Sequence, residues 1–144
     1  MASFYNYTCS KFTWHKVGDN FIIDNKFTIS LDDKNYCYKL TILPGFITDG
    51  GSIPRFFNWF AKGWTDDYLY NGIYILHDAL YCTEYTTREI ADDMLRSSLR
   101  DYGFDRLHAS TICWAVNTFA KCHYGKEHDE NDNYEFVKFT VSSL

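Results

Sequence analysis

A histidine and an aspartate stand side by side in the middle of an apolar segment, Ile75-Leu76-His77-Asp78-Ala79-Leu80-Tyr81. Burying two ionisable side chains costs several kcal/mol unless they find partners or a ligand. A neutral histidine can accept a proton near pH 7, and its second ring nitrogen then needs a fixed acceptor. The pair therefore indicates either a chemical site or a polar core network in which backbone groups and tyrosine hydroxyls satisfy both side chains.

The pair lies on a predicted helix that begins after Thr65 and runs to about Cys82. The Thr65 hydroxyl is expected to cap this helix, and its residues are apolar nearly all round, which is typical of a buried helix. The next helix opens with the capping-box pattern Thr86-Thr87-Arg88-Glu89 and stops at Gly103. Because only a few residues join the two helices, we expect them to pack antiparallel.

An acidic residue of the second helix is expected to face the pair. At ~100° per residue, the apolar residues of this helix form one broad stripe, and Asp92 falls at its edge, about 20° around the helix from Leu99. Asp93 points away from the stripe and is expected to be solvated. The packing therefore predicts that Asp92 joins His77 and Asp78 in one hydrogen-bonded cluster.

A further predicted helix, from about Asp105 to His123, carries two histidines, His108 and His123, on its apolar face. Each is most simply a satisfied core histidine, although either can complete a site around the first pair. Histidines on facing helices can also supply zinc ligands. A zinc site made of His77, His108, His123 and a carboxylate therefore stays open.

The loop of residues 45–55 combines a glycine pair with polar side chains. Such a loop can present free amides and carbonyls to an anion or a metal. The candidate binding residues are Thr48, Asp49, Gly50, Gly51, Ser52 and Arg55. The alternative is a tight strand-to-helix turn, with Asp49 and Ser52 as local caps before a short helix over residues 53–60. The glycines match neither a dinucleotide-binding nor a P-loop pattern. The predicted cluster of His77 is expected to lie beside this loop.

The composition bounds the fold and excludes some partners. The 144 residues are 46% hydrophobic and 23% charged, which suffices for one folded domain over residues 1–144. The net charge of −5, without a run of lysines or arginines, argues against nucleic acid as a partner. No apolar stretch approaches the ~20 residues of a transmembrane segment. Five cysteines without a CxxC pair predict reduced thiols.

Short segments rich in Phe, Ile, Thr and Tyr predict an antiparallel β meander in the first third of the chain. These segments are residues 12–17, 20–23, 27–31 and 36–43. Residues 134–141 predict a last strand. The sequence therefore predicts an α+β fold, in which a small antiparallel sheet, made of the N-terminal meander and the C-terminal strand, packs on three to four helices.

Three motifs carry a resemblance to a known family. TDGGSIPR at residues 48–55, HDALY at residues 77–81 and an Arg-x-x-Ala-Asp segment at residues 88–92 resemble a family of small uncharacterised phage and prophage proteins, a domain of unknown function. The resemblance covers roughly residues 43–125. It implies a phage or prophage origin, and hence the host cytoplasm or the virion as the location and a phage or host protein as a partner. It brings no established activity.

The helical half is also similar to the phospholipase A-two superfamily, in which a His-Asp pair on one helix and a second Asp on an antiparallel helix form the site. The similarity implies that His77 activates water, that Asp92 orients His77 and that Asp78 binds calcium. Carbonyls around Gly50 and Gly51 would complete the metal shell, since calcium prefers oxygen ligands. A second layer of side chains, expected to contact the site residues rather than the substrate, consists of Tyr81, His108 and His123.

Three functional hypotheses follow. The first is a metal-assisted hydrolase, with calcium or zinc, that acts on a lipid or cell-wall ester or amide. The second is a non-enzymatic phage accessory or virion protein that binds a protein partner through an aromatic surface at residues 56–60. The third is a host-takeover protein that sequesters a ligand without turnover.

Overall fold

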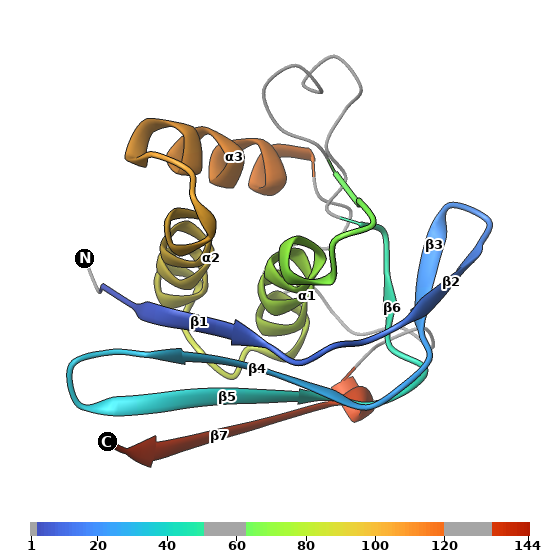
Figure 1. Cartoon of the computed structure of the whole chain (residues 1–144), viewed down its shortest axis with the longest axis horizontal. Coiled ribbons are helices and arrows are strands. Elements are labelled where there is room, and N and C mark those ends of the chain that lie inside the picture. The colour runs from blue at the N-terminus through green and yellow to red at the C-terminus, as the bar shows by residue number, and fades with distance from the viewer. Residues whose placement is uncertain (1–2, 51–62, 120–133) are drawn as a thin grey trace.

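The computed structural model describes residues 3–50, 63–119 and 134–144 (Figure 1). The elements, in chain order, are β1 (Tyr5–Cys9), β2 (Trp14–Val17), β3 (Asn20–Ile23), β4 (Phe27–Asp32), β5 (Tyr36–Ile42), β6 (Ile47–Thr48), α1 (Tyr68–Thr83), α2 (Arg88–Tyr102), α3 (Arg106–Phe119), η2 (Tyr134–Phe136) and β7 (Val137–Ser143). The short helix predicted over residues 53–60 lies outside the described residues.

The strands form two antiparallel sheets. The larger sheet has the order β1-β4-β5-β7, and the smaller one has the order β2-β3-β6. The C-terminal strand returns to the large sheet, where β7 pairs with β5 from Tyr36↔Ser143 to Ile42↔Val137. The predicted α+β class is therefore confirmed, but the meander is divided between two sheets, and β1 is a strand that the sequence pattern did not indicate.

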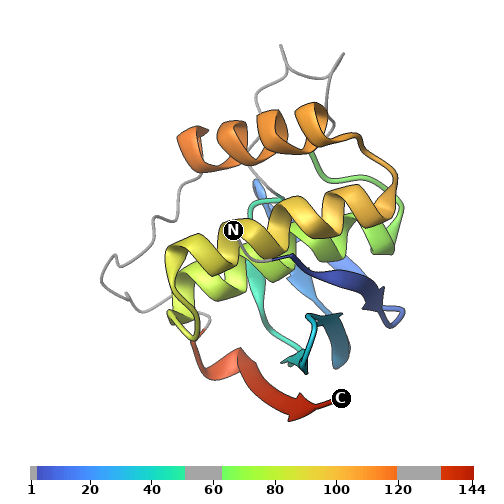
Figure 2. The same ribbon diagram turned by 90° about the vertical axis from the view of Figure 1, so that its left-hand side faces the viewer.

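The helices cover one face of the large sheet. In both views α1 and α2 lie on that face and α3 lies beyond them, so the molecule has three layers (Figures 1 and 2). Along β4 the side chains of Phe27, Ile29 and Leu31 are buried, and those between them are partly exposed. This period of two is what a strand with one covered face requires.

The helix starts correct the sequence prediction by one or two residues. Asp67, not Thr65, caps α1, because the backbone N–H of Leu69 donates to its carboxylate. Thr87, not Thr86, caps α2 by accepting from the N–H of Ile90. The predicted end of α2 at Gly103 is confirmed, with a φ of 138°.

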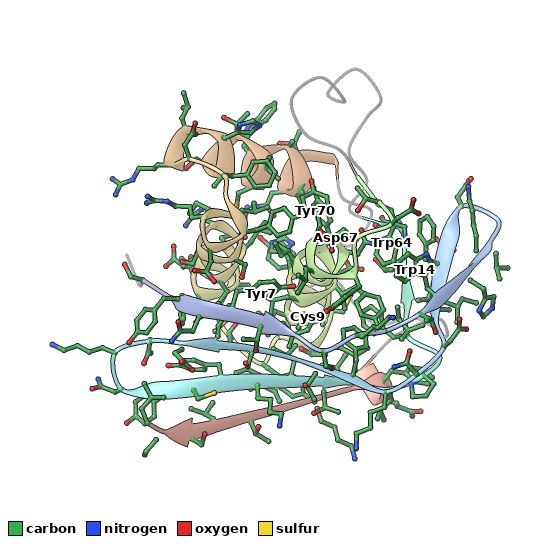
Figure 3. All side chains as sticks on the ribbon, viewed as in Figure 1. Tyr7, Cys9, Trp14, Trp64, Asp67 and Tyr70 are labelled. Carbon is green, nitrogen blue, oxygen red and sulfur yellow. The ribbon has the colours of Figure 1, made fainter. Side chains whose placement is uncertain are left out.

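Strand β1 packs unusually close to α1 at Gly72. A Cβ at this position would lie 2.6 Å from the hydroxyl oxygen of Tyr7 and 2.7 Å from Sγ of Cys9. Figure 3 shows Tyr7 and Cys9 between β1 and α1, and the hydroxyl of Tyr7 donates to the carbonyl of Leu69 at 2.7 Å. The absence of a side chain at Gly72 therefore lets this strand and helix meet.

The cysteines within the described ranges are free thiols, namely Cys9, Cys37, Cys82 and Cys113. No helix built from the described residues has the length and apolar character that crossing a membrane requires.

Candidate functional site

A hydrogen-bonded histidine and aspartate join α1 to α2. Nε2 of His77 lies 3.0 Å from Oδ1 of Asp92. His77 is only 3% exposed, because it stands on a helix that is buried on nearly all sides. The contact between these two residues, which the helical spacing predicts, is present in the structure.

Two further donors reach the same carboxylate oxygen. The hydroxyl of Tyr81, one helical turn after His77, donates to Oδ1 of Asp92 at 2.7 Å, and the Tyr81 ring lies 4.1 Å from the imidazole. Nδ2 of Asn117 on α3 donates to this oxygen at 3.2 Å. Side chains from α1 and α3 therefore converge on Asp92 of α2.

The environment favours the neutral form of His77 and the ionised form of Asp92. Burial lowers the pKa of His77 below its usual value, and this effect outweighs the hydrogen bond and the charge of Asp92. Burial also opposes ionisation of Asp92, but the donors His77, Tyr81 and Asn117 more than compensate, so the pKa of Asp92 lies below its usual value. At neutral pH His77 is thus uncharged and Asp92 is a carboxylate.

These charge states fix the tautomer of the imidazole. A carboxylate oxygen can only accept, so the proton of neutral His77 belongs on Nε2, facing Asp92. The lone pair is then on Nδ1. Such a nitrogen can accept a proton from a water molecule, while Asp92 stabilises the imidazolium that forms.

The neighbouring Asp93 corrects the sequence prediction. It is not solvated but buried, and it forms an ion pair with Arg96 one turn later. The reason is that α3 packs against α2 on this side, so that Nη1 of Arg96 also lies 3.5 Å from Sγ of Cys113. Burial raises the pKa of the Cys113 thiol to about 11, which leaves it protonated and a poor nucleophile.

Asp78, next to His77 on α1, is partly buried and takes part in interactions of its own. The structure shows the pair His77–Asp92, and the place of Asp78 in the predicted cluster stays a prediction. The metal-binding role of Asp78 stays a prediction.

The described part of the glycine loop forms a tight turn. Thr48 is buried, and its hydroxyl accepts from the N–H of Gly50 at 3.2 Å. Gly50 has a φ of 79°, and a Cβ there would lie 3.0 Å from the side chains of Phe21 and Trp64. Asp49, between them, is partly buried. The turn thus belongs to the packing of the small sheet.

Several predicted site residues lie outside the described ranges. These are Gly51, Ser52, Arg55, His123 and the aromatic residues at positions 56–60. His108 is described: it is partly buried, its ring packs on Phe104 at 5.0 Å, and its backbone N–H donates to Asp105. Its part in the predicted site stays a prediction.

The described side chains do not by themselves form a metal centre. Over residues 3–50, 63–119 and 134–144, no three His, Cys, Asp or Glu residues come together in a group that could hold an ion.

Asn117 is the residue of this site that the sequence analysis missed. Its signal is weak but real, because it lies about 40° around the helix from Cys113, on the buried side of α3. A search for ionisable side chains passes over an amide. Only the packing of α3 on α2 reveals that this amide meets Asp92.

Comparison with known proteins identifies a family for this chain. A model of a family described as "Protein of unknown function (DUF1353)" matches residues 23–116, about two thirds of the chain. No curated protein and no solved structure matches significantly. The matched region contains His77, Tyr81 and Asp92 and ends one residue before Asn117. The chain therefore belongs to the DUF1353 family of proteins, whose function is unknown.

Proposed function

We propose that this protein is a hydrolase in which His77 is the general base and Asp92 orients it. The observation that carries the proposal is the buried hydrogen bond between Nε2 of His77 and the carboxylate of Asp92, with the imidazole neutral. A base of this kind contributes typically a 10²- to 10⁴-fold rate enhancement. The resemblance of the α1–α2 pair to the phospholipase A-two site supports an ester or amide as the substrate class.

The proposed reaction is the attack of water on a carbonyl carbon. Nδ1 of His77 takes a proton from the water as its oxygen bonds to the carbonyl carbon. The resulting imidazolium then gives the proton to the leaving alcohol or amine as the old bond breaks, so that the base is restored. Asp92 stabilises the imidazolium through Nε2, and the hydroxyl of Tyr81 helps to keep that carboxylate ionised.

The steps above are assigned to His77, Asp92 and Tyr81. Calcium or zinc held by Asp78 is a separate proposal. It is supported by the place of Asp78 next to His77 in the sequence and by the affinity of carboxylates for these ions.

The biological setting is also part of the proposal. The motifs at residues 48–55, 77–81 and 88–92 support a phage or prophage origin. From that origin we infer that the protein works in the host cytoplasm or in the virion, on a lipid or cell-wall ester or amide.

The test uses two His→Gln variants. His77→Gln removes the proposed base. His15→Gln is the control, because His15 forms an exposed His–Asp pair on the small sheet, with its Nδ1 2.6 Å from Asp24. The assay measures hydrolysis of nitrophenyl esters, phospholipid vesicles and peptidoglycan fragments. We expect His77→Gln to lose at least 10²-fold in rate and His15→Gln to retain the wild-type rate.

The same assay examines the metal. Calcium, zinc or a chelator is added to the wild type and to Asp78→Asn, and a metal effect that Asp78→Asn abolishes supports the ion site. A His77→Gln variant that hydrolyses these substrates at the wild-type rate would refute the role of His77 as the base. A wild type that hydrolyses none of the substrates would favour the non-enzymatic hypotheses, a partner-binding or ligand-sequestering protein.

A further inference from the structure

We infer that Asn117, near the end of α3, is a positioning residue that orients the carboxylate of Asp92 toward His77. The inference deepens the proposed function and rests on it for its catalytic meaning. Its structural basis is independent of that function, because it comes from the contacts of one amide side chain.

The orientation of this amide is settled by its neighbours. Nδ2 of Asn117 lies 3.2 Å from Oδ1 of Asp92 and 3.7 Å from Sγ of Cys113. Turning the amide over would bring its oxygen against the carboxylate oxygen, so that two acceptors would face each other without a proton. The N–H group must therefore point at Asp92.

In this orientation the other end of the amide has no partner among residues 3–50, 63–119 and 134–144. Oδ1 of Asn117 is buried and accepts no hydrogen bond from these residues. A buried acceptor without a donor is unfavourable, and an apolar side chain of the same shape would avoid that cost. The free-energy gain that offsets it is the donation to Asp92, which indicates that the amide serves the carboxylate rather than the packing of α3.

The donation acts on a carboxylate whose surroundings are otherwise mixed in charge. Among the described residues, the titratable and charged groups that face it are His77 and Tyr81 on α1, Arg88, Asp93 and Arg96 on α2, and Cys113 on α3. The two arginines stay charged at every pH of interest. Changes in the titration of the dyad therefore report on its hydrogen bonds.

Removing the amide should shift both members of the dyad in the same direction. A donor favours the ionised form of Asp92, so its loss lets Asp92 hold a proton up to a higher pH. The carboxylate charge that the amide no longer disperses acts more strongly on His77, which then also keeps its proton to a higher pH. The acid limb of the pH–rate profile should move to higher pH by the same amount as the midpoint of His77.

The test is a pH titration of Asn117→Leu by NMR, with ¹⁵N-labelled histidine and ¹³C-labelled aspartate. His77 is identified by the signal that His77→Gln lacks. We expect the neutral imidazole of the wild type to carry its proton on Nε2, and the midpoints of His77 and Asp92 to rise by about half a unit to one unit in the variant. Thr118→Ala, a change at the exposed neighbour on α3, is the control and should move neither.

The outcomes separate this inference from the proposed function, since the titration needs no turnover. Midpoints that are the same in Asn117→Leu and the wild type would overturn the inference, whether or not the protein hydrolyses anything. A shift in a protein without hydrolase activity would support the contact and refute the hydrolase. If Asn117→Leu does not fold, Asn117→Asp takes its place. A second carboxylate about 3.2 Å from Asp92 must raise the titration midpoint of the two carboxylates. An unchanged midpoint in this variant also overturns the inference.

Discussion

Replacing Asp92 with asparagine removes one charge at the meeting point of three helices and almost no volume. In the wild type, Oδ1 of Asp92 accepts from His77, Tyr81 and Asn117. The carboxylate fixes the proton of His77 on Nε2 and stabilises the imidazolium of the proposed reaction. An amide does neither reliably, because its nitrogen can turn toward His77 and reverse the tautomer.

The expected loss of rate follows from that role. We expect kcat/KM of Asp92→Asn to fall by about 10²- to 10⁴-fold, which corresponds to about 3–5 kcal/mol of transition-state stabilisation. Stability should fall by less. A hydrogen bond to a charged group contributes about 1.5–3 kcal/mol and a neutral one about 0.5–1.5 kcal/mol. With the Asp92 side chain 14% exposed, the free energy of unfolding should drop by about 1–3 kcal/mol.

The adjacent Asp93→Asn is the matched control. Asp93 is as buried as its neighbour or more so, and it pairs with Arg96 instead of His77. Its loss should lower the free energy of unfolding by a similar amount, about 1–3 kcal/mol, without moving the rate. Both variants are compared by urea unfolding and by kcat/KM at a temperature where each is fully folded.

The comparison has a clear refuting result. If Asp92→Asn keeps a rate within about threefold of the wild type, less than any general-base contribution, the carboxylate does not assist the histidine. If Asp93→Asn loses as much rate as Asp92→Asn, the loss reflects damage to the packing of α2 and not to the chemistry of His77.

Three further predictions concern stability. Burial holds the pKa of His77 below its unfolded value of ~6.5, so the unfolded chain binds a proton that the folded chain does not, and the free energy of unfolding should fall as the pH drops below ~6.5. Urea unfolding across this pH range should show a smaller dependence of the unfolding free energy on pH in His77→Gln than in the wild type. An equal dependence in both proteins would contradict the prediction. Gly72→Ala places a methyl group 2.6 Å from the Tyr7 hydroxyl and 2.7 Å from Cys9 Sγ. The free energy of unfolding should therefore fall by about 1–3 kcal/mol, measured by thermal unfolding. An unchanged thermal midpoint would mean that β1 and α1 pack less closely than the structure shows. Asp67→Ala removes the cap of α1 and should cost about 0.5–2 kcal/mol in urea unfolding, whereas wild-type stability would contradict the capping role.

Patterns that depend on one element could be predicted from the sequence. The alternation of β4, the apolar surface of α1 and the end of α2 at Gly103 all follow from local periodicity or backbone geometry. Strand β1 was missed because its pattern is irregular. Its pairing with β4 shifts register between Tyr5 and Thr8, and Asn6 has a φ of 56°, so the strand lacks a clean period of two.

The same distinction explains the site. The contact of His77 with Asp92 could be predicted because a short connection fixes α1 and α2 as antiparallel neighbours and the helical period fixes which side chains face inward. The burial of Asp93 and the role of Asn117 depend on how α3 packs on α2. No pattern within a single helix contains that information, so these residues needed the three-dimensional arrangement.

Two His–Asp pairs of the described residues differ in their surroundings. His15 and Asp24 form their pair on the surface, where water satisfies whatever they leave unpaired. His77 and Asp92 form theirs among buried side chains, beside an amide whose oxygen has no donor in the part of the chain that the structure describes. Apolar residues of similar volume would hold α1, α2 and α3 together at a lower desolvation cost. The desolvation cost of this arrangement supports the proposal that His77 takes part in proton transfer.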